Sequence, residues 1–399
     1  MGPFRPCLSN VHKCCVNLFA CWIVEPGSTR MLNSQPVTSE LSPLVAKPPA
    51  NDANVQAPLR IATLQDIGAA VWDAFVYREP TATFFHLSGW QRVVQKVYGF
   101  DTHYLAAVRD NRVVGVLPLV HVRSALFGNS LISNAYCVYG GIAGQEPDVV
   151  YELADAAARL ANKLAVGYVE LRSIEPCVPD WPVKSDIYAT FQRPLYPSEQ
   201  ENLKAIPRKK RADVRKGMKN NLTIDLSGDL DAFYDIYAES VRNLGTPVFS
   251  KRFAAAIQQE FGDRCEVSLA CGPDGPVAAL MSFYFRDRVL PYYGGGSMAA
   301  RPLHGYDQLY WTLMCRAVDR GATVFDFGRS KFGTGAFEYK KYWGFEPTAL
   351  HYQYHLAKSE VVPDINPLNP KYRLMVAAWK KLPLFAAGRL GPWLSRQLG

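Results

Sequence analysis

The chain has 399 residues, of which 48% are hydrophobic and 20% are charged. This composition is that of a globular protein, and the length favours two or three domains with sizeable cores. The chain lacks any run of about eighteen consecutive apolar residues, so a transmembrane helix is not expected. The formal net charge of +8 would by itself suit a polyanionic partner.

The positive charge is concentrated in two segments. Residues 204–219 contain eight basic side chains and one acidic one, and residues 371–399 contain six basic side chains and no acid. The rest of the chain is therefore mildly acidic, which argues against general nucleic-acid binding. The nine cysteines are odd in number and lack C-x-x-C spacing, which indicates a reducing, cytoplasmic compartment and neither a disulfide framework nor a metal site.

The segment 1–57 differs from the remainder. It joins a short apolar run to a stretch rich in Pro, Ser, Asn and Ala, which is typical of an unstructured leader. We expect this leader to be disordered, or its first thirty residues to precede the true start of translation, for which Met31 is a candidate.

From residue 59 the chain alternates strand-like and helix-like segments. The first half predicts, in chain order, a strand at 60–64, helices at 66–77 and 88–98, strands at 103–109, 113–122 and 131–139, a helix at 152–164 and a strand at 168–172. The second half predicts a strand at 222–226, helices at 230–244 and 251–261, strands at 265–271, 277–286 and 289–293, a helix at 306–319 and a strand at 323–327. Asp66 and Asp229 are predicted to cap the first helix of each half.

The two halves also share a short motif. The sequence Tyr-Gly-Gly starts at residue 139 and again at residue 293, and a glycine follows each motif at the same distance, at positions 167 and 321. This constant spacing predicts a duplicated domain. The repeated order β-α-α-β-β-β-α-β is that of the GNAT acyltransferase fold, so the predicted fold class is α/β (α+β), with two tandem GNAT-like acyl-N-acyltransferase domains that have mixed central sheets.

We expect five segments along the chain. They are the leader at 1–57, an N-terminal GNAT-like domain at 58–200, a basic linker at 201–221, a C-terminal GNAT-like domain at 222–360 and a basic amphipathic tail at 361–399.

The segment 324–347 holds the densest group of candidate site residues. Strand alternation separates Asp326 from its phenylalanine neighbours, and Asp326 is a candidate for orienting an amine or its proton. The glycine-rich loop that follows carries Arg329 and Lys331, cations that suit a phosphate or carboxylate beside exposed amides. A solvated loop in which Asp326 pairs with Arg329 is the alternative.

Two lysines lie among aromatic residues further along this segment. A desolvated lysine can hold an anion or a developing oxyanion, so Lys340 is a candidate for charge stabilisation. Snorkelling of Lys340 and Lys341 on an amphipathic helix is equally consistent with the sequence. The histidines lie apart from any nucleophile motif, and His351 and His355 are expected on a solvated strand face.

Five segments carry a resemblance to a known family: DFGRSKFGTGAFEYKKYWGFEP, HYQYHL, DINPLNPKYR, PYYGGGSMAARPLHGYDQLYWTLMCRAVDRGA and IPRKKRADVRKG. They resemble the FemAB-like proteins associated with exosortase/PEP-CTERM systems, which are part of the FemABX peptidyltransferase group with two GNAT-like domains. The resemblance covers residues 59–399. It implies transfer of an aminoacyl or acyl group to an amine acceptor, in extracellular polysaccharide or cell-envelope assembly.

The resemblance also implies roles for single residues. Lys340, preceded by Tyr339, falls where the family's lysine contacts the donor and stabilises the intermediate. The residues Tyr293, Arg301 and Tyr306 fall where relatives bind the phosphate of the acceptor.

The acyl donor is expected as a co-substrate, and no bound cofactor is expected. Residues 297–306 lack the Arg/Gln-x-x-Gly-x-Gly/Ala spacing whose amides hold the pyrophosphate of acyl-CoA. The chain also lacks a long heptad insertion of the kind that relatives use for aminoacyl-tRNA. Acyl-CoA and aminoacyl-tRNA therefore both stay open as donors.

The two basic segments are candidate binding surfaces. Helical spacing places Arg208, Arg211 and Arg215 on one face, where they suit a phosphorylated or lipid-linked acceptor, or tRNA; a solvated linker helix is the alternative. The tail at 371–399 mixes Trp, Leu and Phe with cations, which is typical of an anchor on an anionic membrane surface, here the inner membrane. A hairpin packed on the second domain is the alternative.

Two other functions fit the sequence. One is an acyl-CoA-dependent acetyltransferase acting on an amino sugar, and the other is a non-catalytic, membrane-peripheral scaffold.

Overall fold

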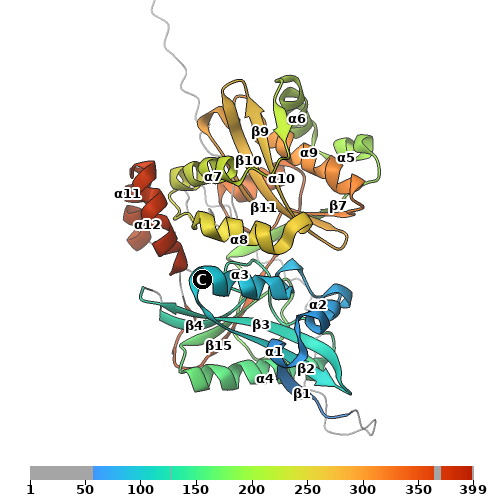
Figure 1. Ribbon diagram of the computed structural model, residues 1–399, viewed down its shortest axis with the longest axis vertical. Helices are drawn as coiled ribbons and strands as arrows, with labels where there is room; N and C mark the ends of the chain where they lie inside the picture. Colours follow the sequence, from blue (N-terminus) through green and yellow to red (C-terminus); the bar gives the residue numbers. More distant parts are fainter. Residues whose placement is uncertain (1–56, 127, 364–369, 398–399) are drawn as a thin grey trace, which may run out of the picture.

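The computed structural model describes residues 57–126, 128–363 and 370–397 (Figure 1). Apart from its last residue, the predicted leader at 1–57 lies outside the described residues.

The first half folds in the predicted order of elements, except that the helix predicted at 66–77 is divided into two helices at Gly68. It contains β1 (Arg60–Thr63), α1 (Leu64–Ile67), α2 (Ala69–Arg78), η1 (Phe84–His86), α3 (Ser88–Tyr98), β2 (Asp101–Arg109), β3 (Arg112–Ser124), β4 (Gly128–Ser133), α4 (Pro147–Leu164) and β5 (Tyr168–Ser173). The predicted cap at Asp66 is wrong, because Thr63 is the N-cap of α1 and accepts the Asp66 N–H. Asp66 is instead its capping-box partner and accepts the Thr63 N–H at 2.7 Å.

The second half repeats this order. It contains β8 (Thr223–Asp225), α7 (Leu230–Leu244), α8 (Lys251–Phe261), η2 (Gly262–Arg264), β9 (Cys265–Gly272), β10 (Gly275–Phe285), β11 (Arg288–Gly296), η3 (Met298–Ala300), α9 (Gly305–Asp319) and β12 (Val324–Asp326). The predicted cap at Asp229 is confirmed, since its carboxylate accepts the N–H groups of Asp231 and Ala232 at 2.9 and 3.0 Å.

Each half builds a mixed sheet with the same pairing. The strands follow the order β1-β2-β3-β4-β5 in one sheet and β8-β9-β10-β11-β12 in the other, and in each only the last pair is parallel. This confirms the tandem GNAT-like fold. The Tyr-Gly-Gly motifs themselves differ: the second lies in β11, whereas β4 ends at Ser133, before the first. The amides of Gly140 and Gly141 bind the Arg172 carbonyl instead, at 3.1 and 3.0 Å.

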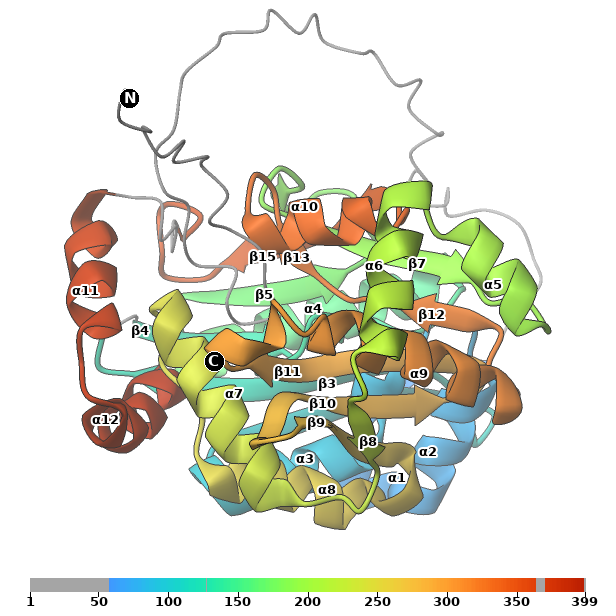
Figure 2. The ribbon, with the colours of Figure 1, turned by 90° about the horizontal axis from the view of Figure 1, so that it is seen from above.

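Two strands cross from one half to the other. The segments after β5 and β12 form β6 (Val183–Lys184), β7 (Tyr188–Pro194), α5 (Glu199–Ala205), α6 (Arg208–Lys219), β13 (Ser330–Lys331), α10 (Gly335–Tyr342), β14 (Pro347–Ala349), β15 (His351–Leu356), α11 (Pro370–Lys380) and α12 (Leu384–Arg396). Strand β7 joins the second sheet between β12 and β13, and β15 joins the first sheet between β5 and β6 (Figure 2). Sheet membership therefore departs from the predicted boundaries 58–200 and 222–360.

The side chains of the crossing strands explain this exchange. Ala189 and Phe191 of β7 are fully buried in the core between the second sheet and α9 and α10, whereas Tyr352 and Tyr354 of β15 are buried in a core to which both halves contribute. Each strand thus adds its apolar face to the other half's sheet.

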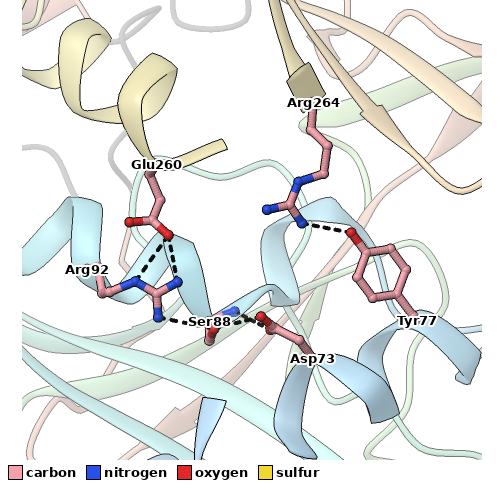
Figure 3. A network of polar contacts seen from close by, with 6 residues as sticks. All are labelled: Asp73, Tyr77, Ser88, Arg92, Glu260 and Arg264. Atoms are coloured by element: carbon pink, nitrogen blue, oxygen red, sulfur yellow. Dashed lines mark hydrogen bonds and ion pairs between the residues drawn. The ribbon is translucent and has the colours of Figure 1, made fainter. Parts of the chain in front are cut away.

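One hydrophobic core also spans both halves. Phe84 stacks on Phe283 of β10 with ring centroids 4.5 Å apart, and Phe85 contacts Tyr292 of β11 at 4.8 Å. Helices α3 and α8 face each other across this contact (Figure 1). Polar side chains close its edge, where Arg92 of α3 donates two hydrogen bonds to Glu260 of α8 (Figure 3).

The two basic segments are both helical. Helix α6 packs along α9, and α11 and α12 form a hairpin against α7 at one side of the molecule (Figure 1). Among the described residues, we find no helix whose length and hydropathy would let it span a bilayer.

Candidate active site between the two halves

A cavity of about 260 Å³ lies between the two halves. In the first half its wall comes from the loop before α3, from residues 139–144 and from residues 172–177 at the end of β5. In the second sheet its wall comes from Gln192, Phe285, Arg288, Leu290 and Asp326. We refer to this space as the interdomain cavity.

The backbone opens the second sheet at this cavity. The parallel strands β11 and β12 pair only between Arg288 and Val324 and between Val289 and Phe325. Leu290 and Asp326 are the next residues along the two strands, and both line the cavity. Strand separation therefore exposes the end of β12 to the interdomain cavity.

Asp326, predicted from the sequence as a site residue, is buried at this position. Its Oδ1 accepts hydrogen bonds from the Tyr139 hydroxyl (3.1 Å) and the Gly328 N–H (2.8 Å), and its Oδ2 accepts one from Gln192 Nε2 (2.8 Å). Burial raises the pKa of the Asp326 carboxyl, although these three donors act in the opposite direction. A cavity-facing carboxylate with a raised pKa is suited to accept a proton from an amine.

A hydrogen-bonded chain holds the carboxylate in place. Arg288 Nη1 donates to Gln192 Oε1 at 3.1 Å, which turns the amide nitrogen of Gln192 toward Asp326. The Tyr139 hydroxyl also contacts the hydroxyl of Thr190 on β7. Gln192 and Arg288 were not predicted from the sequence, because no motif marks them and the partner strand of β12 was not predicted. Tyr139 did carry a signal, as the first residue of the repeated Tyr-Gly-Gly motif.

The first-half wall is held by buried polar groups. The Thr83 N–H donates to His86 Nδ1 at 3.0 Å, so Nε2 carries the proton and donates to the Gly141 carbonyl at 2.9 Å. Burial lowers the pKa of His86 to about 4, which keeps the ring neutral near pH 7. Arg172 is buried beside it in the wall and pairs with Glu170 at 2.7 Å.

Lys340 lies next to this site, but it is not among the residues that line the cavity. Its Nζ donates to the carbonyls of Gly328 and Arg329, both at 3.0 Å, and it is buried near the rings of Phe191 and Phe327. The snorkelling alternative is therefore wrong for Lys340. These contacts support the loop that directly follows Asp326.

Arg329 and Lys331 are buried as well, so the solvated-loop alternative is wrong. The Arg329 guanidinium donates to the Tyr352 hydroxyl and lies 4.4 Å from the ring centroid of Tyr188. Lys331 belongs to β13, which pairs with β7. The loop after β12 is thus fastened to both crossing strands.

Tyr339 belongs to a second buried polar cluster, between α6, α9 and α10. Its hydroxyl donates to Asp307 Oδ1 at 3.0 Å, and Lys210 forms a buried ion pair with the same oxygen. The ligand atoms of Asp213, His304 and Asp307 lie within 4.8 Å of one another. Because the Lys210 ammonium already supplies a positive charge there, this cluster is an ion pair that joins three helices. Lys210 was not singled out in the sequence.

The three residues predicted to bind the acceptor phosphate lie in different environments. Tyr293 is buried with its ring centroid 4.9 Å from that of Phe249, and Tyr306 is buried beside Gly296 at the start of α9. Arg301 is exposed in the turn after η3. The structure does not bring these three predicted residues to the interdomain cavity.

The basic helix α6 presents part of its charge to solvent. Arg208 and Arg215 are exposed, whereas Arg211 is half-buried and donates to the carbonyls of Lys204 and Ile206 at the end of α5. Two of the three predicted arginines are therefore accessible to an anion.

Comparison with known proteins agrees with this architecture. Residues 208–341 match the family model of the acetyltransferase (GNAT) domain. The chain is similar to the crystal structure of FemX, with 16% identity and a TM-score of 0.61, over 80% of this chain and 100% of that one. It is also similar to a tandem GNAT protein from the clavulanic acid biosynthesis pathway (12% identity, TM-score 0.49, 77% of this chain and 100% of that one).

A third similar structure is the C-terminal domain of a putative lysylphosphatidylglycerol synthetase from Agrobacterium fabrum (12% identity, TM-score 0.49, 79% of this chain and 97% of that one). Curated protein sequences gave no match. The chain thus has a fold similar to that of FemX, and residues 208–341 in its second half match the acetyltransferase (GNAT) domain.

Proposed function

We propose that this protein is an N-acyltransferase that transfers an aminoacyl or acyl group to an amine held in the interdomain cavity. The observation that carries this proposal is the position of Asp326, a buried carboxylate that faces the cavity where β11 and β12 separate. This carboxylate lies within the segment that matches the GNAT domain.

The chemistry needs positioning and a proton acceptor. The neutral amine attacks the carbonyl carbon of the donor, a C–N bond forms, and the C–S bond of a thioester or the C–O bond of an ester breaks. The proton from the amine nitrogen passes to Asp326, and the leaving thiolate or alkoxide takes a proton from solvent. Tyr139 and Gln192 orient the accepting carboxylate.

Lys340 acts on this site through the backbone. Its bonds to the carbonyls of Gly328 and Arg329 support a positioning role for Lys340, since Gly328 in turn donates its N–H to Asp326. The contact with the donor that the FemAB resemblance implies for Lys340 stays a prediction.

The substrates follow from the resemblance and from the exposed charge. The donor is acyl-CoA or aminoacyl-tRNA, and the acceptor is a phosphorylated or lipid-linked amine whose phosphate meets Arg208 and Arg215. The biological setting is extracellular polysaccharide or cell-envelope assembly, at the cytoplasmic face of the inner membrane. The association with PEP-CTERM systems belongs to this proposal.

Transfer can be tested with the purified full-length protein, supplied with acyl-CoA or with aminoacyl-tRNA and a panel of amino sugars and lipid-linked amines. Mass spectrometry should detect the acylated acceptor. Asp326→Asn should lower the rate by about 10²–10⁴-fold. Asp274→Asn, in the exposed turn between β9 and β10, is the matched control and should keep the wild-type rate. Transfer from neither donor, or equal rates in the two variants, would contradict the proposal.

A further inference from the structure

The helical hairpin of α11 and α12 packs on the rest of the molecule through a tryptophan of α11 and a stripe of small residues of α12. Trp379 Nε1 donates to the Thr246 carbonyl at 3.1 Å, and α12 buries Ala387, Gly391 and Ser395. These three residues are spaced by four, so they form one stripe along the helix. A Cβ added to Gly391 would lie 2.9 Å from atoms of Val248, which means that the helix backbone itself lies against the second half.

The large apolar side chains of this helix point the other way. Phe385 is 71% exposed, Trp393 is 55% exposed and Leu390 is 49% exposed. A surface helix of a globular protein normally buries its large apolar residues and exposes its polar ones. Helix α12 does the opposite, so its outer face is built for an apolar environment other than the protein's own core.

The charge on this outer face has one sign. Arg389 lies four residues from both Phe385 and Trp393, so the three exposed side chains form one stripe, and Lys381 and Arg396 are exposed at the two ends of the helix. The chain has no acidic residue between positions 371 and 399. Two aromatic rings with an arginine between them, and no acid, complement a surface that is apolar inside and negatively charged outside.

We propose that the outer face of α12 docks on an anionic lipid membrane surface. Phe385, Leu390 and Trp393 enter the boundary between headgroups and acyl chains, and Arg389 meets lipid phosphates. The hairpin is fastened to both halves, because Gln397 Oε1 accepts the Ala125 N–H at 2.9 Å next to the β3–β4 turn. Docking would therefore fix the orientation of the whole protein on the membrane.

The test is flotation of the full-length protein with lipid vesicles, either of phosphatidylcholine alone or of phosphatidylcholine mixed with phosphatidylglycerol. The wild type should float with the mixed vesicles only, and less so in 1 M salt than in 0.1 M salt, because salt shortens the Debye length from about 10 Å to about 3 Å. Phe385→Ser with Trp393→Ser should reduce binding about tenfold or more. Arg389→Glu should reduce binding to the mixed vesicles as well.

The matched control is Val71→Ser with Leu226→Ser, which removes two other exposed apolar side chains and should leave binding unchanged. Circular dichroism should show the same melting temperature for both double variants, since all four positions are exposed. Failure of the wild type to bind the mixed vesicles would overturn the proposal, and so would undiminished binding of the Phe385/Trp393 variant. The proposal would also be overturned if the wild type were a dimer and the Phe385/Trp393 variant a monomer. A second copy of the chain would then cover the outer face of α12.

Discussion

Replacing Gln353 with leucine should both destabilise the protein and disturb the wall of the interdomain cavity. Gln353 is fully buried in the crossing strand β15. Its Oε1 accepts the N–H groups of Cys177 and Val178 at 2.7 and 3.1 Å, and its Nε2 donates to the Val178 carbonyl. Because Cys177 lines the interdomain cavity, a side chain of β15 holds a wall built by the first half.

The expected cost follows from these contacts. The leucine leaves two backbone N–H groups and one carbonyl without their partner, at about 1–3 kcal/mol for each buried group. Burial of the more apolar side chain offsets about 2 kcal/mol. We therefore expect the free energy of unfolding to fall by about 1–7 kcal/mol and the KM for the acceptor to rise, because residues 172–177 lose their anchor.

Urea unfolding followed by tryptophan fluorescence measures the first effect, and acceptor titration in the transfer assay measures the second. The control is Gln95→Leu on α3, where an exposed amide donates to Thr102 at 2.7 Å and its loss should cost about 0.5 kcal/mol or less. If Gln353→Leu were as stable as Gln95→Leu and kept the wild-type KM, the inferred link between β15 and the cavity would be refuted.

Three further predictions concern buried charge. Burial raises the pKa of Asp326 above its ordinary value of 3.8, so the stability that its bound proton contributes is present at low pH and is lost as pH rises through the raised pKa. Thermal unfolding between about pH 4 and pH 8 should show this loss of stability in the wild type and not in Asp326→Asn. The transfer rate of the wild type should rise over the same pH range, as the carboxylate becomes free to accept a proton. The prediction is contradicted if the stability of the wild type and of Asp326→Asn depends on pH in the same way. Lys340→Met should lower the free energy of unfolding by about 2–4 kcal/mol, since two buried carbonyls lose their donor, whereas Lys341→Met at the exposed neighbour should stay near the wild type in the same urea titration. Lys210→Met should cost about 3–5 kcal/mol by leaving the Asp307 carboxylate buried and unpaired, and adding Asp307→Asn should recover part of that loss; no recovery in the double variant would show that the pair is not coupled.

Local patterns were sufficient to predict the elements of each half. The helix predicted at 251–261 is α8 with the same bounds, and the cap at Asp229 is present, because periodicity and capping act within a few residues. The solvated face expected for His351 and His355 on β15 is wrong in part, since both side chains are half-buried and Gln353 between them is fully buried against the end of β5. That burial depends on which sheet β15 joins, and a short alternating strand carries no local signal for its partner.

The same limit explains which site residues were found. Asp326 was predicted because it ends a strand beside a glycine-rich loop, and both features lie in one segment of the sequence. Its partners Gln192 and Tyr139 come from other segments, and only the pairing of β12 with β7 and the packing of the two halves bring them together. Asp326 could thus be predicted as a candidate catalytic residue, whereas the residues that donate hydrogen bonds to its carboxylate could not be predicted as a group.

The strand exchange has a consequence for how a substrate reaches the site. Separation of the two GNAT-like halves would break the ladders of β7 with β12 and of β15 with β5, and it would expose the shared core around Phe84 and Phe283. Each of these losses costs far more than a hinge motion between loosely linked domains. Opening the cavity by separating the halves is therefore costly, and an acceptor of the proposed reaction is expected to enter without such a separation. A rigid wall suits a reaction that depends on holding an amine and a carbonyl carbon in register.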